Sequence, residues 1–218
     1  IERFAADVSH EIKNPLTSIR SALETLPLVK VEAQREKLTA LLQQDVRRLD
    51  RLITDISNAS RLDAELARDR PRTVDLAALL RDIVDVYQSS PRPGDVPLRL
   101  SINTPGPTRI VGRDGPLGQV IRNLIDNARS FSPSDGSVRL TLDRAPDGSQ
   151  DIRIRVEDDG PGIPAENLET VFQRFYTSRP KGTQFGTNSG LGLSIVRQII
   201  EAHGGGGRAE NIVDAENP

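Results

Sequence analysis

Apolar residues recur every three or four positions through the first part of the 218-residue chain. This spacing is that of an amphipathic helix, whose apolar side chains form one stripe along its length. One stripe runs from Phe4 to Leu26, a second runs from Leu38 to Ile56, and Pro27 ends the first helix. The pattern therefore predicts a hairpin of two long helices. Because such a hairpin has too little core of its own, we expect two copies to form a four-helix bundle in a homodimer.

The pattern changes beyond residue 66. Residues 67–74 are charged and contain a proline, which is typical of a linker. Further along, helical and alternating segments are mixed. Helices are predicted at 75–87, 114–131 and 190–204, and strands at 96–102, 108–112, 137–144 and 151–158. The predicted fold class is therefore α+β, with a dimerisation hairpin at 1–66, a linker at 67–74 and a second domain at 75–218.

Composition narrows the classes of function. The formal net charge is -2, so the chain lacks the basic excess of a nucleic-acid-binding protein. There is no cysteine, which excludes disulfides and thiolate metal sites. No apolar run reaches the roughly 20 residues that cross a bilayer. Since the chain has no methionine and begins inside a predicted helix, we expect a fragment of a longer protein whose membrane segments lie upstream.

One of the two histidines, His10, lies almost opposite the apolar stripe of its helix. An exposed neutral imidazole is a competent nucleophile near neutral pH. The next residue, Glu11, can orient the ring or accept its proton, and Pro15 can kink the helix one turn later. The pattern by itself is also compatible with an ordinary solvent-facing histidine. The other histidine, His203, is expected to cap the end of its helix.

The segment FAADVSHEIKNPLTSIR (4–20) resembles the H-box of bacterial sensor histidine kinases, with its pattern His-Glu-x-x-Asn-Pro. This resemblance implies that His10 is the phosphorylated residue and that Glu11 assists the transfer. It also implies that Asn14 positions the water that dephosphorylates a response regulator.

Two segments of the second domain carry side chains suited to a nucleotide. Asn123 and Asn127 lie on one helical face, where amide oxygens can help to hold Mg²⁺, although such a pair is more often a solvated face. In VEDDGPGIP (156–164), the carboxylate of Asp158 can accept a hydrogen bond from an amine. Gly160 and Gly162 let the backbone approach a ligand, although this pattern alone is more often a turn.

A third segment, NSGLGLSIV (188–196), opens a helix whose free N–H groups suit phosphates. It lacks the glycine spacing of a dinucleotide fold and the lysine of a P-loop. Before it lies a polar segment, 176–189, which is a candidate mobile loop. Three aromatic residues lead into this loop: Phe172, Phe175 and Tyr176. Their pattern is also compatible with ordinary side chains of the hydrophobic core, and for Phe172 we favour the core.

Together, NLIDNA, VEDDGPGIP, VFQRFYTSRP and NSGLGLSIV resemble the N-box, first glycine box, F-box and second glycine box of the same family, in the family's order. The resemblance covers nearly the whole chain. It implies the GHKL (Bergerat-type) ATP-binding fold, an α/β sandwich with a mixed sheet and helices on one face. Three further stretches, SALETLP, DVRRLDRLI and NARSFSP, most resemble the ChvG type of sensor kinase.

The resemblance also implies roles for individual residues. Asn123 and Asn127 face Mg²⁺ and the triphosphate, and Asp158 binds the adenine amino group. The remaining residues expected to contact ATP or ADP come from the glycine boxes and the lid: Gly160, Gly162, Tyr176, Arg179, Lys181, Gly190, Leu191, Gly192 and Leu193.

The function implied is that of an ATP-dependent kinase that phosphorylates His10, passes the phosphoryl group to an aspartate of a response regulator and also dephosphorylates it. We expect the chain to be the cytoplasmic portion of an inner-membrane protein. Ser130 departs from the family, which commonly has a cation there, so we predict that Arg179 or Lys181, rather than Arg129, serves the phosphates. The alternative is that all three are solvated surface charges and that Ser130 donates a sufficient hydrogen bond. A GHKL ATPase and a nucleotide-binding pseudokinase scaffold stay as alternatives.

Overall fold

The structure, a computed structural model, describes residues 2–68, 70–91, 94–147, 149, 151–176 and 189–212. The chain divides into two compact units. The first comprises Ile1–Arg61 and Gln173–Leu191, and the second comprises Leu62–Phe172 and Gly192–Pro218.

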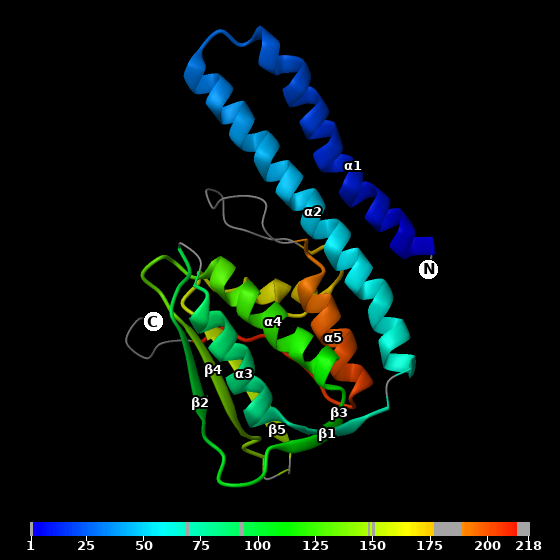
Figure 1. The fold of residues 1–218 in the computed structure, drawn as a ribbon, viewed down its shortest axis with the longest axis vertical. Coiled ribbons are helices and arrows are strands. Elements are labelled where there is room, and N and C mark those ends of the chain that lie inside the picture. Colours follow the sequence, from blue (N-terminus) through cyan, green and yellow to red (C-terminus); the bar gives the residue numbers. More distant parts are fainter. Residues whose placement is uncertain are drawn as a thin grey trace. The chain divides into compact units, whose positions relative to one another are not determined.

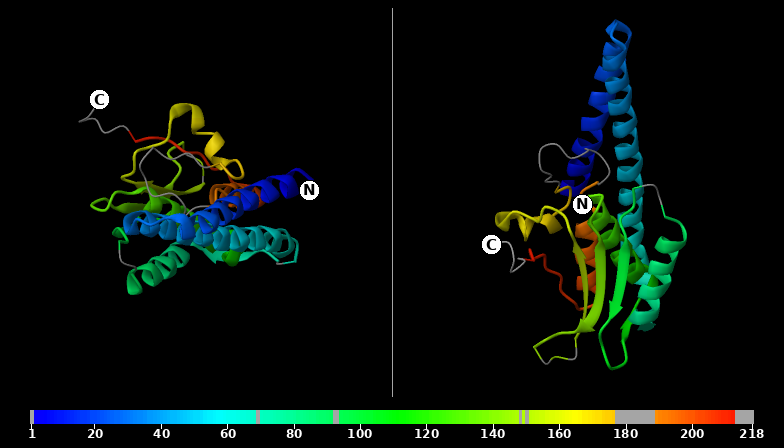
Figure 2. Two further views of the ribbon diagram at one scale, coloured as in Figure 1. Left: turned by 90° about the horizontal axis from the view of Figure 1, so that it is seen from above. Right: turned by 90° about the vertical axis from the view of Figure 1, so that its left-hand side faces the viewer.

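The first unit contains the predicted helical hairpin. Helix α1 spans Glu2–Thr25, the short 3-10 helix η1 spans Leu26–Leu28, and helix α2 spans Glu32–Arg68, whose last residues belong to the second unit. The two long helices lie side by side (Figures 1 and 2). The buried side chains of these helices include Pro15 and Ala22 of α1 and Leu52 of α2.

The apolar stripes of the hairpin are wider than one chain can cover. Large apolar side chains of both helices stay about half exposed: Leu16 at 51%, Leu23 at 55%, Val46 at 54% and Ile53 at 57%. Part of each apolar stripe therefore faces solvent in this chain. Neither of these helices, nor any other in the described part of the chain, is long and apolar enough to cross a membrane.

In the second unit, a strand follows the end of α2 where we expected a linker. Helix α2 continues to Arg68, and strand β1 spans Arg72–Asp75, so most residues of the predicted linker at 67–74 lie in a helix or a strand. Strand β1 pairs antiparallel with β3, which spans Arg109–Gly112. The sequence did not indicate this strand, because only Val74 of its four residues is buried and no alternation is visible.

A three-stranded mixed sheet forms the centre of the second unit. Its strands are β2 (Leu98–Ile102), β4 (Val138–Arg144) and β5 (Ile152–Asp158), in the order β2-β4-β5. Strands β2 and β4 are parallel, and β4 and β5 are antiparallel. The mixed sheet and all four predicted strands are therefore confirmed.

Helices pack against the strands and against one another in this unit (Figure 1). Helix α3 (Leu76–Ser89) packs against β2, α4 (Asp114–Phe131) against β4 and β5, and α5 (Gly192–Ala202) against α4. Two short 3-10 helices, η2 (Ala165–Asn167) and η3 (Thr170–Phe172), lie between β5 and α5 in the sequence. The core contains Leu80, Ile125, Leu140, Leu142 and Ile199, all fully buried.

Asp75 caps helix α3, at the N-terminal position that the sequence predicts. Its carboxylate accepts hydrogen bonds from the backbone N–H groups of Ala77 (3.1 Å) and Ala78 (3.3 Å) and from the Thr108 hydroxyl (2.7 Å). The bond from Thr108 is the largest cause that holds the pKa of Asp75 below its usual value. Since Thr108 directly precedes β3, the cap also connects α3 to the two-stranded sheet of β1 and β3.

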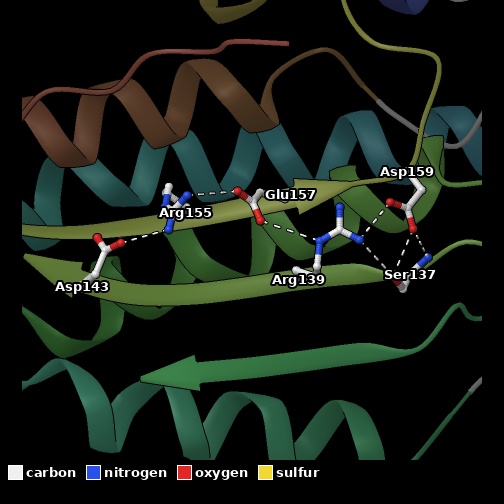
Figure 3. Close-up of polar contacts among 6 residues, drawn as sticks. All are labelled: Ser137, Arg139, Asp143, Arg155, Glu157 and Asp159. Carbon is white, nitrogen blue, oxygen red and sulfur yellow. Dashed lines mark hydrogen bonds and ion pairs between the residues drawn. The ribbon is translucent and has the colours of Figure 1, made fainter. Parts of the chain in front are cut away.

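The face of the sheet turned away from the helices carries a charged network (Figure 3). Arg139 forms ion pairs with Glu157 (3.7 Å) and Asp159 (2.9 Å), while Arg155 pairs with Asp143 (3.0 Å). Arg139 and Glu157 are direct cross-strand partners, and opposite charges in such positions stabilise the register of an antiparallel pair.

Candidate functional site

His10 lies on an exposed part of α1. Asn14, one turn later, is exposed on the same side of the helix, as predicted. Within the described part of the chain, no hydrogen bond or ion pair to the His10 ring is present. Helix α1 continues through Pro15, whose side chain is buried. The ring is therefore open to an incoming group.

Glu11 faces a different neighbour. Its carboxylate lies against α2, where it pairs with the guanidinium of Arg48 at 2.9 Å. The two side chains are 23% and 27% exposed, so the pair is largely shielded from water. This partner could not be identified from the sequence, because Arg48 is one of several arginines on α2 and lies 37 residues away.

The side chain of His203 is held by two hydrogen bonds to the backbone. Its Nε2 accepts a hydrogen bond from the backbone N–H of Arg113 (3.1 Å), and its Nδ1 bonds the carbonyl of Ile199 (2.7 Å). Both ring nitrogens are thus engaged, and the side chain links the end of α5 to the start of α4. The predicted role at the end of its helix is confirmed, and the residue has no lone pair left for chemistry.

Asn123 and Asn127 of α4 are both half-buried, one turn apart on the same face. The amide nitrogen of Asn123 donates to the carbonyl of Gly192, the first residue of α5, at 3.2 Å. This bond fixes the side chain without using its amide oxygen. In the described part of the chain, no group of three His, Cys, Asp or Glu side chains could hold a metal ion.

Asp158 ends β5, with its carboxylate half-buried. One oxygen accepts a hydrogen bond from the backbone N–H of Gly160 at 2.9 Å. Burial raises the pKa of Asp158 above its usual value, and the neighbouring charge of Asp159 adds to the rise. A half-buried carboxylate with one oxygen fixed is a suitable acceptor for an amine.

The glycines that follow Asp158 are required by the geometry. A Cβ on Gly160 would lie 2.5 Å from an Asp158 oxygen and 3.0 Å from the Phe131 carbonyl oxygen. Gly162 has a φ of +76°, and a Cβ there would lie 3.0 Å from the side-chain oxygen of Asn211. Bulkier residues would therefore displace the backbone of this segment.

Asn211 is a residue that the sequence did not predict at this site. Its side-chain oxygen accepts from the N–H of Ile163 (2.8 Å), and its amide nitrogen donates to the carbonyl of the same residue (2.6 Å). The two bonds hold the backbone beside Gly162. The only signal in the sequence was the Ala-Glu-Asn segment itself, since nothing local connects positions 48 residues apart.

The second glycine box is divided between the two units. In the second unit, Gly192 and Leu193 are half-buried in the first turn of α5, which begins two residues later than predicted. In the first unit, Gly190 has a φ of +76° and its carbonyl accepts from the N–H of Phe175 at 2.9 Å. Leu191 is buried, with its N–H bonded to the Ser189 hydroxyl at 3.1 Å.

The aromatic residues before the lid differ in burial. Phe172 is buried, with the Arg197 guanidinium over its ring at 4.5 Å, so the preference for core is confirmed. Tyr176 is half-buried in the first unit. Arg179 and Lys181, with most of the predicted loop, lie outside the described residues.

Arg129 is committed to a structural cluster. It forms an ion pair with Asp95 (2.8 Å), and its guanidinium lies over the Tyr87 ring, 5.0 Å from the centroid. The hydroxyl of Ser130 donates to the Asn127 carbonyl at 2.8 Å. The preference for a lid cation over Arg129 is therefore consistent with the environment of Arg129.

Comparisons with known proteins match both parts of the chain. Residues 1–65 match the His Kinase A (phospho-acceptor) domain, and residues 112–215 match the family of histidine kinase-, DNA gyrase B- and HSP90-like ATPases. The chain is 54% identical to the sensor protein ChvG of Rhizobium meliloti (strain 1021), over 97% of this chain and 37% of that protein. It spans little more than a third of the length of the curated relatives it matches.

Solved structures show the same architecture. Full-length ShkA in complex with AMPPNP is 28% identical, with a TM-score of 0.56 over 94% of this chain and 43% of that chain. Histidine kinase ThkA in complex with the response regulator protein TrrA has a TM-score of 0.66 over 93% of this chain and 55% of that chain. At 24% identity the second likeness shows the fold alone. With a phospho-acceptor domain followed by an ATPase domain of this type, the chain belongs to the sensor histidine kinases of two-component systems.

Proposed function

We propose that the chain binds ATP in its second domain, phosphorylates His10 in its first domain and passes the phosphoryl group to an aspartate of a response regulator. The domains in this proposal are 1–66 and 75–218. The observation that carries it is the contrast between the two histidines. His10 is exposed on α1, whereas both ring nitrogens of His203 are already bonded.

At His10, a ring nitrogen attacks the γ-phosphorus, a P–N bond forms, and the bond to the bridging oxygen breaks as ADP leaves with its electron pair. The other ring nitrogen carries a proton and becomes more acidic as the ring gains positive charge. Glu11, the adjacent carboxylate, accepts this proton or holds it by a hydrogen bond. In the opposing activity, the exposed amide of Asn14 orients a water molecule that hydrolyses the aspartyl phosphate of the regulator.

In the second domain, Asp158 accepts a hydrogen bond from the adenine amino group, and Gly160 and Gly162 let the base approach the backbone. The N–H groups at the start of α5, from Gly192 and Leu193, bind phosphate oxygens. Tyr176, Gly190 and Leu191 are assigned to the same nucleotide on the family pattern.

The side chains of α4 fit a hard divalent cation. Asn123 and Asn127 offer amide oxygens, which are ligands that Mg²⁺ accepts alongside phosphate oxygens. When bound, Mg²⁺ neutralises part of the charge of the triphosphate. Because Arg129 is held by Asp95 and Tyr87, we assign the remaining phosphate charge to Arg179 or Lys181.

The exposed apolar residues of the hairpin support a homodimer. Leu16, Leu23, Val46 and Ile53 lie on α1 and α2, and a second hairpin would cover them in a four-helix bundle. ATP and response regulators are found in the cytoplasm, so we place the chain there, as the catalytic portion of an inner-membrane sensor.

Incubation of the wild-type chain, His10→Gln and His203→Gln with γ-labelled ATP tests the proposal. Acid-labile, base-stable label is expected on the wild type and on His203→Gln, and none on His10→Gln, although His10→Gln should bind ATP normally. Released phosphate without labelled protein would indicate an ATPase instead, and neither product would indicate a nucleotide-binding scaffold. Label that persists on His10→Gln would refute the assignment of His10.

A further inference from the structure

The ion pair between Glu11 and Arg48 joins α1 to α2 directly beside His10. The Oε2 of Glu11 and the Nη2 of Arg48 are 2.9 Å apart, and each side chain is about one-quarter exposed. A charge-assisted hydrogen bond of this length is among the stronger polar contacts in proteins. Glu11 is therefore held at the interface of the two helices.

In this arrangement the carboxylate is turned away from the histidine that it is proposed to assist. Successive residues of an α-helix are rotated by about 100°, so neighbouring side chains do not face each other. His10 is exposed to solvent, whereas Glu11 is half-buried against α2. For its carboxylate to serve the His10 ring, Glu11 must loosen its bond to Arg48.

A second carboxylate is available to Arg48. Asp45 precedes it by three residues on α2, a spacing that places both side chains on one face of the helix. One oxygen of Asp45 and the Nε of Arg48 are both buried without a hydrogen-bond partner among the residues that the structure describes. Buried polar atoms without partners are unfavourable, so a turn of the Arg48 side chain towards Asp45 would satisfy both.

We propose that Arg48 is a positioning residue that holds Glu11 away from His10, and that Asp45 competes with Glu11 for Arg48. This inference rests on the proposed role of Glu11 in the phosphorylation of His10. When Arg48 pairs with Glu11, the carboxylate is withdrawn and phosphorylation is slow. When Arg48 turns to Asp45, Glu11 is released and can support the ring of His10.

The proposal predicts effects of opposite sign from two neighbouring residues. Arg48→Gln removes the restraint and raises the rate of autophosphorylation. Asp45→Asn removes the competing charge, leaves Arg48 on Glu11 and lowers the rate. Each change is expected to be roughly two- to five-fold, the range set by a partly shielded ion pair. In a Glu11→Gln background neither substitution should change the slower rate that remains.

The test measures the initial rate of label incorporation into the whole chain across a range of ATP concentrations. Arg48→Gln and Asp45→Asn should change kcat in opposite directions and leave the KM for ATP unchanged. Arg47→Gln, the exposed neighbour on α2, serves as the matched control and should match the wild type. Sedimentation confirms that every variant keeps the oligomeric state of the wild type.

Several outcomes would overturn the inference. If both substitutions lower kcat, Arg48 and Asp45 act only in packing the hairpin. If the rates do not change, or if the effects persist in Glu11→Gln, the restraint does not act through Glu11. A Glu11→Gln chain as active as the wild type would remove the basis of the inference while leaving His10 as the acceptor, and a wild type without label would refute the proposed function itself.

Discussion

A single methyl group added at Gly160 should weaken ATP binding strongly. In Gly160→Ala, the new Cβ would lie 2.5 Å from an oxygen of Asp158 and 3.0 Å from the carbonyl oxygen of Phe131. Neither distance is tolerable for a carbon and an oxygen that are not bonded. The Phe131 oxygen belongs to the backbone at the end of α4 and cannot easily move, so the carboxylate of Asp158 must turn away.

The size of the effect follows from the contacts that this movement breaks. Asp158 would lose the hydrogen bond from the Gly160 N–H, now 2.9 Å long, and such a bond to a charged group is worth about 1.5–3 kcal/mol. The displaced carboxylate would also leave its position for the adenine amino group. A loss of about 2 kcal/mol in binding corresponds to a roughly 30-fold higher Kd. Overpacking should lower the free energy of unfolding by about 1–3 kcal/mol.

Direct titration with ATP gives the Kd, and urea unfolding gives the stability of the same variant. Gly115→Ala is the matched control, because a Cβ there has no neighbour within 4 Å and lies in the first turn of α4. The control should bind ATP like the wild type. If Gly160→Ala is stable and binds ATP within about two-fold of the wild type, the carboxylate of Asp158 does not need its present position, and the reasoning fails.

Three further predictions concern single side chains. Asp158→Asn should weaken ATP binding but raise the urea midpoint at neutral pH. Burial raises the folded-state pKa of Asp158, so the ionised carboxylate destabilises the folded state as the pH rises through that pKa, whereas a neutral amide does not. A lower midpoint would contradict this. Asn14→Ala should keep autophosphorylation and lose regulator dephosphorylation, because its exposed amide lies one turn from His10; equal dephosphorylation rates in the two proteins would exclude that role. Arg129→Ala should lower the free energy of unfolding by about 2 kcal/mol by removing the ion pair with Asp95 and the contact with the Tyr87 ring, with little change in ATP affinity. A large loss of affinity in a stable variant would make Arg129 the missing phosphate cation.

The elements of the second unit could be predicted to within two or three residues in most cases. Helix α4 was predicted at its observed bounds, 114–131, because it has both a complete apolar face and clear ends. Strands β4 and β5 show the alternation of a half-covered sheet and were also predicted. Strand β1 was missed, because four residues with one buried side chain carry too little pattern to distinguish a strand from a linker.

The candidate site was predictable where its chemistry is contained in one segment. The glycines after Asp158 are an example, because the turn that they form and the carboxylate that they surround lie within five residues. The exposure of His10 also followed from its position relative to the apolar stripe of one helix. In each case the decisive property is local, so the order of residues along the chain determines it.

By itself, then, the sequence determined the helical hairpin, the alternating strands, the solvent-facing histidine and the glycine-lined carboxylate, since each depends on residues close together in the chain. Tertiary structure alone decided that Glu11 meets Arg48, that Asn211 holds the backbone of Ile163 and that His203 is bonded at both nitrogens. The physical reason is that periodicity indicates which side of an element is buried but not which residue of another element lies opposite. That choice is made by the packing of whole elements, in which residues tens of positions apart meet within hydrogen-bond distance.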